Sequence, residues 1–170
     1  MVSPAHVDVV LMMGSASDLK HLKGGITLLG ELGLVSRVHV SSAHRTPMRT
    51  KDIIRQAEDD GCKVFICAAG MAAHLAGVVA SFTIRPVLGV PLPGGVLDGV
   101  DALLSTVQMP GGIPVATFAV GSAGAKNAAV FAAQIIATER KDVAQALRLM
   151  REAAALKVEQ SEAEVLAELS

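Results

Sequence analysis

The sequence predicts an α/β fold in which a parallel sheet is covered by helices on both faces. Two observations carry this prediction: short apolar runs alternate with helical segments along the chain, and short loops that are mostly glycine-rich separate them. Strands that alternate with helices pair in parallel through right-handed crossovers, and ligands gather at the carboxyl ends of such strands. At 170 residues, the chain has the length of one domain with a real core.

The first strand is predicted over residues 7–13, a run of apolar residues near the amino terminus. A helix follows over residues 17–32, weakened by Gly24 and Gly25, because glycine in a helix interior costs conformational entropy. Residues 35–40 form the second predicted strand, which is again apolar.

The next helix has start and stop signals. Thr46 is a good N-cap, the proline after it suits the first helical position, and Gly61 ends the predicted helix over residues 47–60. Residues 64–68 form a third strand, and an alanine-rich helix is predicted over residues 72–81.

The second half continues the alternation. Residues 86–90 are predicted as the fourth strand, and a short helix covers residues 100–107. The fifth strand covers residues 115–120, and a buried, alanine-rich helix covers residues 125–138.

The tail over residues 139–170 differs from the rest. It is rich in Ala, Glu and Leu, and it has no strand to accompany it. Val143, Leu147 and Met150 recur at helical spacing. The pattern predicts a terminal helix within the same single domain. We expect the apolar side chains of this helix to pack on a neighbouring subunit.

Composition excludes several classes of function. The formal charge of −1 argues against a general nucleic-acid binder, and four Phe without Tyr or Trp give single-stranded nucleic acid no stacking platform. Residues 64–84 carry no charge over a length that could span a bilayer. Because this stretch divides into a β-rich piece, a glycine turn and a helix, a buried strand–turn–helix is preferred over the membrane alternative.

The cysteines and the amino terminus indicate a cytoplasmic protein. Cys62 and Cys67 are separated by four residues, which suits neither a CxxC redox pair nor a four-ligand zinc site, so we expect two reduced core thiols. Residues 7–13 lack a basic leader and a cleavage site, so no signal peptide is expected.

The loops after the five strands carry the candidate chemistry. Four of them combine Gly with small or hydroxyl residues, which lets backbone amides approach a ligand. In chain order they are GSASD (14–18), SSAHRTP (41–47), AAGMAAHL (68–75), PLPGG (91–95) and GSAGAKN (121–127).

The first loop has two interpretations. Its two serines at a helix start form an anion site, or Ser15 or Ser17 simply caps the helix. The chain has neither a GxxxxGK[ST] phosphate loop nor a GxSxG nucleophile elbow, and GSASD is not the GxGxxG dinucleotide motif.

The second loop places His44 beside Arg45 at a strand end. Guanidinium binds phosphate or carboxylate through a rigid fork, and imidazole exchanges a proton near neutral pH. His74, at the start of an apolar helix, has a hydrogen-bonded core histidine as its default interpretation. Since the loops hold too few carboxylates for a magnesium site, the residues predict proton transfer on a phosphorylated small molecule without metal or ATP.

The motifs in this order resemble the 5-(carboxyamino)imidazole ribonucleotide mutases of purine biosynthesis. The resemblance runs over residues 7–137 and also includes PVLGVP, GVDALLSTVQMPGGIPVATFAVG and GAKNAA. It implies a flavodoxin-like three-layer sandwich and a homo-octamer with swapped C-terminal helices and sites between subunits. It also implies the transfer of a carboxylate from the exocyclic nitrogen of the substrate to a ring carbon, through carbon dioxide and without a cofactor.

The resemblance also assigns residues. His44 is the implied general acid and base, and Ser15, Asp18 and Arg45 bind the ribonucleotide. The full set expected at the substrate is Gly14, Ser15, Ser17, Asp18, Ser42, Ala43, Arg45, Gly70, Met71, Ala72, Ala73, His74 and Leu75.

The chain departs from the family pattern at three places. Met71 stands where Gly is usual, Ala76 where Pro is usual, and PLPGGVLDG is less polar than the common fourth loop. A sister branch, the aminoimidazole ribonucleotide carboxylases, has Lys after the histidine and a polar third loop, so Arg45 and AAGMAAHL favour the mutase. The carboxylase and a silent ribonucleotide-binding relative stay as alternatives.

Overall fold

The computed structural model describes residues 6–169, and within them five strands form one parallel sheet in the order β2-β1-β3-β4-β5. This order is flavodoxin-like, with the first crossover on one side of β1 and the others on the opposite side. The strands are β1 Val9–Met13, β2 Ser36–Val40, β3 Val64–Ala69, β4 Val87–Pro91 and β5 Ala116–Thr117.

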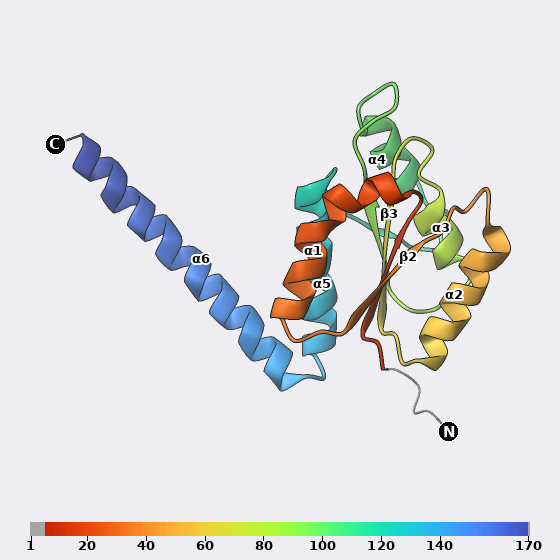
Figure 1. The fold of residues 1–170 in the computed structure, drawn as a ribbon, viewed down its shortest axis with the longest axis horizontal. Helices are drawn as coiled ribbons and strands as arrows, with labels where there is room; N and C mark the ends of the chain where they lie inside the picture. Colours follow the sequence, from red (N-terminus) through yellow and green to blue (C-terminus); the bar gives the residue numbers. More distant parts are fainter. Residues whose placement is uncertain (1–5, 170) are drawn as a thin grey trace.

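Helices cover both faces of the sheet, which gives the three layers that were predicted. In Figure 1, α1 and α5 lie together on one side of the strands, and α2 and α3 lie on the other. The helices are α1 Leu19–Glu31, α2 Pro47–Asp59, α3 Leu75–Ala80, α4 Val100–Val107, α5 Ser122–Ala137 and α6 Lys141–Glu168, with a 3-10 turn, η1, over Ala16–Asp18.

Strand β1 shows how the core is divided between the two faces. Its side chains alternate, so that Val9, Leu11 and Met13 join the cluster beneath α1 and α5. Val10 and Met12 join the cluster beneath α2 and α3. All five are buried, as expected for a central strand of a sheet covered on both faces.

Gly25, which weakens the predicted helix, has a packing role in α1. A Cβ at this position would lie 2.7 Å from the carbonyl oxygen of Ala125 on α5. The absence of a side chain therefore lets the backbones of α1 and α5 approach each other closely.

Three predicted boundaries were wrong. The helix expected over residues 72–81 begins at Leu75, because Met71 and Ala73 have positive φ angles of 52° and 40° that no helix contains. The strand expected over residues 115–120 is reduced to Ala116–Thr117, because β5 pairs with β4 at only two positions. The following helix begins at Ser122, three residues earlier than the predicted residue 125.

Thr46 precedes α2 as predicted, but its hydroxyl does not cap that helix. Its Oγ1 donates to the carbonyl of Ser42 at 3.0 Å and accepts from the amide of Ser42 at 3.0 Å. The side chain therefore closes the second loop on itself and gives the loop a defined shape.

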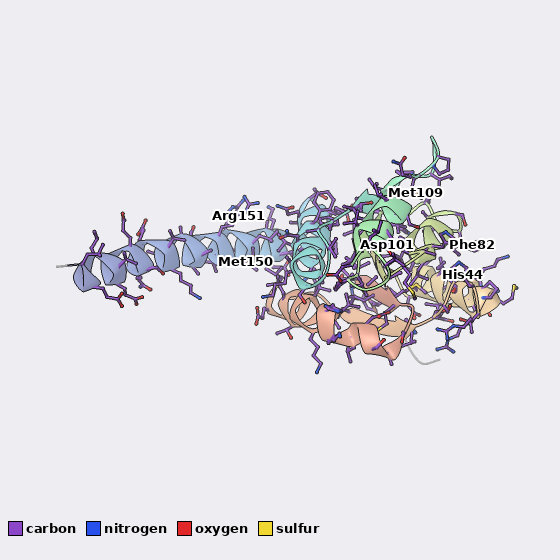
Figure 2. All side chains as sticks on the ribbon, turned by 90° about the horizontal axis from the view of Figure 1, so that it is seen from above. His44, Phe82, Asp101, Met109, Met150 and Arg151 are labelled. Carbon is purple, nitrogen blue, oxygen red and sulfur yellow. The ribbon has the colours of Figure 1, made fainter. Side chains whose placement is uncertain are left out.

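The tail is helical, but the prediction for its first apolar residues was wrong. Val143 and Leu147 are buried in the chain's own core beside α5, and Met150 packs against the same cluster. From residue 151 onward the described side chains are exposed, and α6 projects away from the body (Figure 1; Figure 2 labels Met150 and Arg151). None of the helices within residues 6–169 combines the length and apolar character needed to cross a membrane.

Candidate active site

The loops at the carboxyl ends of β1 to β4 enclose a cavity of about 690 Å³. It is lined by His44 and by every residue of the set expected at the substrate, from Gly14 in the first loop to Leu75 at the start of α3. Ala69 and residues 92–95 line it as well, although they were not in the predicted set. The loop over residues 121–127 does not line this cavity.

In the first loop, the capping interpretation is confirmed. Ser15 is the N-cap of η1: the amide of Ser17 donates to its Oγ at 3.4 Å, and its own amide donates to the Asp18 carboxylate at 3.0 Å. The hydroxyls of Ser15 and Ser17 lie 2.9 Å apart and both residues line the cavity. The cap therefore presents two hydroxyl groups to the cavity.

Arg45 connects the second loop to the first. Its guanidinium donates to the carbonyl oxygen of Gly14 at 3.3 Å, and its amide donates to the hydroxyl of Ser42 at 3.3 Å. A permanent cation is thus held beside the two serine hydroxyls, which is an arrangement suited to an anionic oxygen cluster such as phosphate.

His44 and His74 come together although they are 30 positions apart in the chain. His44 Nε2 lies 2.7 Å from His74 Nδ1, and the rings meet edge to face with centroids 4.8 Å apart. His74 is exposed at the cavity, so its interpretation as a core histidine was wrong.

The contact between these two imidazoles has a chemical consequence. A hydrogen bond between two ring nitrogens needs one donor and one acceptor, so a single proton lies between them. A change in which ring carries that proton switches His44 Nε2 between donor and acceptor. Both rings line the cavity, where an imidazole can exchange a proton with a bound group.

The third loop forms an apolar wall of the cavity, made of small residues and Met71. The Ser105 hydroxyl on α4 donates to the carbonyl of Ala72 and ties this loop to α4. Met71 is a long apolar side chain, yet it is 66% exposed. Its backbone has a positive φ, which is uncommon for a residue other than glycine.

Two carboxylates hold the fourth loop in place. Asp98 accepts from the amide of Gly94 at 3.2 Å, and Asp101 on α4 accepts from the amides of Gly99 at 3.2 Å and Ala102 at 2.9 Å.

Within residues 6–169, no group of three or more His, Cys, Asp or Glu side chains is placed to hold a metal ion.

The two cysteines are core thiols, as predicted, and neither lines this cavity. Both are free and buried. Burial raises the pKa of the Cys62 thiol to about 11 and raises the pKa of the Cys67 thiol further. Both therefore stay protonated at neutral pH and serve as small core residues.

The sheet order and the location of the cavity define a flavodoxin-like α/β protein with a candidate ligand site at the carboxyl ends of its strands. The family model described as AIR carboxylase matches residues 8–157, and the chain belongs to this family.

Relatives and solved structures agree with this assignment. The chain is 48% identical over 151 residues to the N5-carboxyaminoimidazole ribonucleotide mutase of Escherichia coli (strain K12), covering 89% of this chain and 88% of the relative. It is 46% identical over 157 residues to the protein of the same name from Methanocaldococcus jannaschii, covering 92% and 96%. The crystal structure of Treponema denticola PurE matches with a TM-score of 0.83 and 29% identity, over 92% of this chain and 96% of that one.

Proposed function

We propose that this chain is an N5-carboxyaminoimidazole ribonucleotide mutase, an isomerase of purine biosynthesis. The observation that carries the proposal is the meeting of the His44–His74 pair with Arg45 and the serine hydroxyls in one cavity. This arrangement is found in a chain that is 46–48% identical, over most of the chain, to proteins with this name.

The substrate is held through its phosphate in this proposal. Arg45 supplies the fork of charged donors, and the hydroxyls of Ser15 and Ser17 supply further hydrogen bonds beside it. Asp18 keeps the first loop in shape and faces the ribonucleotide. A ribonucleotide, and not a nucleic acid, is the partner that a cavity of this size accepts.

His44 acts as both general acid and general base. As the bond between the carboxylate carbon and the exocyclic nitrogen breaks, carbon dioxide leaves and the nitrogen takes a proton from His44. The ring carbon then attacks the carbon dioxide, and its hydrogen passes as a proton to His44, which restores the starting state. The net reaction moves a carboxylate within one molecule and transfers no electrons, so it needs no cofactor.

His74 positions His44 and shares its proton through the 2.7 Å contact. The small residues Gly70, Ala72 and Ala73 hold the freed carbon dioxide beside the ring. Holding it there replaces an encounter in solution with a positioned reaction, which contributes several kcal/mol to the lowering of the barrier.

The proposal extends to assembly in the cytoplasm as a homo-octamer of single-domain subunits, with part of α6 packed on a neighbour. The exposed apolar side chains on α6 support it, because isolated helices seldom leave such residues uncovered. They are Leu149, Leu156, Val158, Val165 and Leu166. Truncation after Glu152 keeps the buried Val143 and Leu147, so we expect a folded protein of lower mass by analytical ultracentrifugation, and an unchanged mass contradicts the assembly proposal.

The function is tested by two parallel reactions without ATP. One contains freshly made carboxyamino substrate in bicarbonate-depleted buffer, and the other contains aminoimidazole ribonucleotide with excess bicarbonate. The mutase forms carboxyaminoimidazole ribonucleotide rapidly only in the first. Rapid product only in the second identifies the carboxylase, and no product in either identifies a silent binder.

A further inference from the structure

Met71 has a backbone conformation that its side chain does not favour. Its φ of 52° lies in the left-handed region, where a Cβ meets the following carbonyl group and glycine is preferred. The neighbouring Gly70, which could adopt such an angle freely, is not among the positive-φ residues. The chain therefore places a long side chain at a position that is better suited to glycine.

Core packing does not explain this choice, because the Met71 side chain is 66% exposed in the chain. It lines the cavity instead. A side chain kept in a strained conformation at a ligand cavity points to a role in that cavity.

The contacts of Met71 show what that role is. Its Cγ lies 3.3 Å from the position that a Cβ at Gly95 would occupy, so the side chain rests on bare backbone across the cavity. Gly95 itself has a φ of 76°, and a Cβ there would lie 2.5 Å from the Asp101 carboxylate. Met71 thus joins the third loop to the fourth loop at a point where the fourth loop has no side chain of its own.

We infer that Met71 is the residue that closes the cavity between these two loops and retains the carbon dioxide released between the two halves of the reaction. Carbon dioxide is small, uncharged and poor at accepting hydrogen bonds, so an apolar wall retains it by shape and dispersion. An unbranched, polarizable thioether fits an irregular gap of this kind. The inference rests on the proposed function and adds no chemical step to it.

The test follows the origin of the carboxylate in the product. Unlabelled carboxyamino substrate is converted in buffer containing ¹³C-bicarbonate and carbonic anhydrase, and the labelled fraction of the product is measured by mass spectrometry. In Met71→Gly and Met71→Ala we expect the ratio of labelled to unlabelled product to rise about fivefold over wild type, which corresponds to about 1 kcal/mol of lost contact.

Two further measurements separate this role from a general loosening of the protein. Met48→Ala is the matched control, because Met48 is 67% exposed and lies outside the cavity. It should label like wild type. In urea, Met71→Gly should unfold at a higher midpoint than Met71→Ala, since only glycine relieves the positive φ.

The outcomes are distinct. If wild type and both Met71 variants give the same labelled fraction, the inference is overturned and the mutase activity stands. The inference is also overturned if Met48→Ala and Met71→Ala both exceed wild type by the same amount. A wild-type protein that converts no carboxyamino substrate refutes the proposed function, and the inference about Met71 is then refuted with it.

Discussion

The two ends of the parallel sheet use polar residues in opposite ways. At the amino ends of β1 to β3, charged groups are paired with one another and with the backbone, and they lie next to the core. At the carboxyl ends of the same strands, polar groups line a cavity, and the backbone beside them has unfavourable φ angles.

Asp8 is the centre of the amino end. Its carboxylate is almost fully buried, and it accepts from the amide of Val35 at 2.8 Å, from Arg140 at 3.3 Å and from His6 at 3.0 Å. Arg140 lies between α5 and α6 and also donates to the carbonyl of Gly33 at 3.1 Å. One carboxylate therefore joins the start of β1, the start of β2 and the base of α6.

The carboxyl end has the opposite character. The His44–His74 contact and the Arg45 contact with Gly14 are both exposed to the cavity. Met71 and Ala73 have positive φ without being glycine. Removing one partner of a buried, paired charge destabilises the fold, because the other charge is left without compensation, whereas an exposed group with a single exchangeable partner is available to a ligand. Substitutions at the two ends should therefore separate stability from activity.

The largest effect is expected for His44→Asn. Loss of the general acid and base should lower turnover by a factor of about a hundred or more, with an unchanged unfolding midpoint. Steady-state kinetics and urea denaturation measure the two quantities. His39→Asn, on β2 outside the cavity, is the control and should keep turnover, so equal loss in both variants contradicts the assignment.

Arg140→Ala should show the reverse pattern. Its removal takes a permanent cation away from the buried Asp8 carboxylate, and because Arg140 is partly exposed we expect a loss of about 2 kcal/mol in the free energy of unfolding. Turnover of the folded enzyme should stay near that of wild type. The exposed Arg148→Ala is the control, and a fall in turnover without a fall in stability would place Arg140 in the site.

These two predictions depend on contacts that the sequence could not predict. The strands and the five loops follow from apolar runs and turn residues, and the topology alone brings the loops after β1 to β4 to one edge. The contact of His44 with His74 depends on the angle at which α3 begins, which the positive φ angles of Met71 and Ala73 determine. No local pattern predicts such angles in non-glycine residues.

The packing of the tail shows the same limit. The helical spacing of Val143 and Leu147 is visible in the sequence, but it does not say which surface they cover. The Asp8–Arg140 pair turns the chain at the end of α5, and the start of α6 therefore packs on its own core. The contact joins residues 132 positions apart, beyond the reach of any periodicity.

Arg45→Ala should have a smaller effect than either variant above. Loss of one charge-assisted clamp on the phosphate should raise KM about tenfold with little change in kcat. Arg49→Ala, on α2 outside the cavity, is the control. An unchanged KM for Arg45→Ala would mean that the phosphate binds elsewhere.

The smallest effect concerns pH and the pair of Arg37 with Asp60. The Arg37 guanidinium, 2.6 Å from the Asp60 carboxylate, lowers the pKa of that carboxyl below its ordinary value of 3.8, and Gln56 adds a hydrogen bond. Because the pKa of Asp60 is lower in the folded state than in the unfolded state, the ionised carboxylate stabilises the protein at pH values above the unfolded-state pKa. This contribution is lost as the pH falls through the folded-state pKa.

Asp60→Asn should therefore flatten the loss of stability as the pH falls below about 4. Urea denaturation at several pH values measures the slope. Asp59→Asn, an exposed neighbour at the end of α2, should keep the wild-type slope. Identical slopes for Asp60→Asn and wild type would show that the pair with Arg37 has no part in acid stability.

The most direct test of the account is turnover of carboxyamino substrate in bicarbonate-depleted buffer by three proteins side by side: wild type, His44→Asn and Arg140→Ala. The proposed function predicts rapid formation of carboxyaminoimidazole ribonucleotide by wild type and Arg140→Ala, and almost none by a folded His44→Asn. Product from His44→Asn at the wild-type rate, or none from wild type, would contradict it.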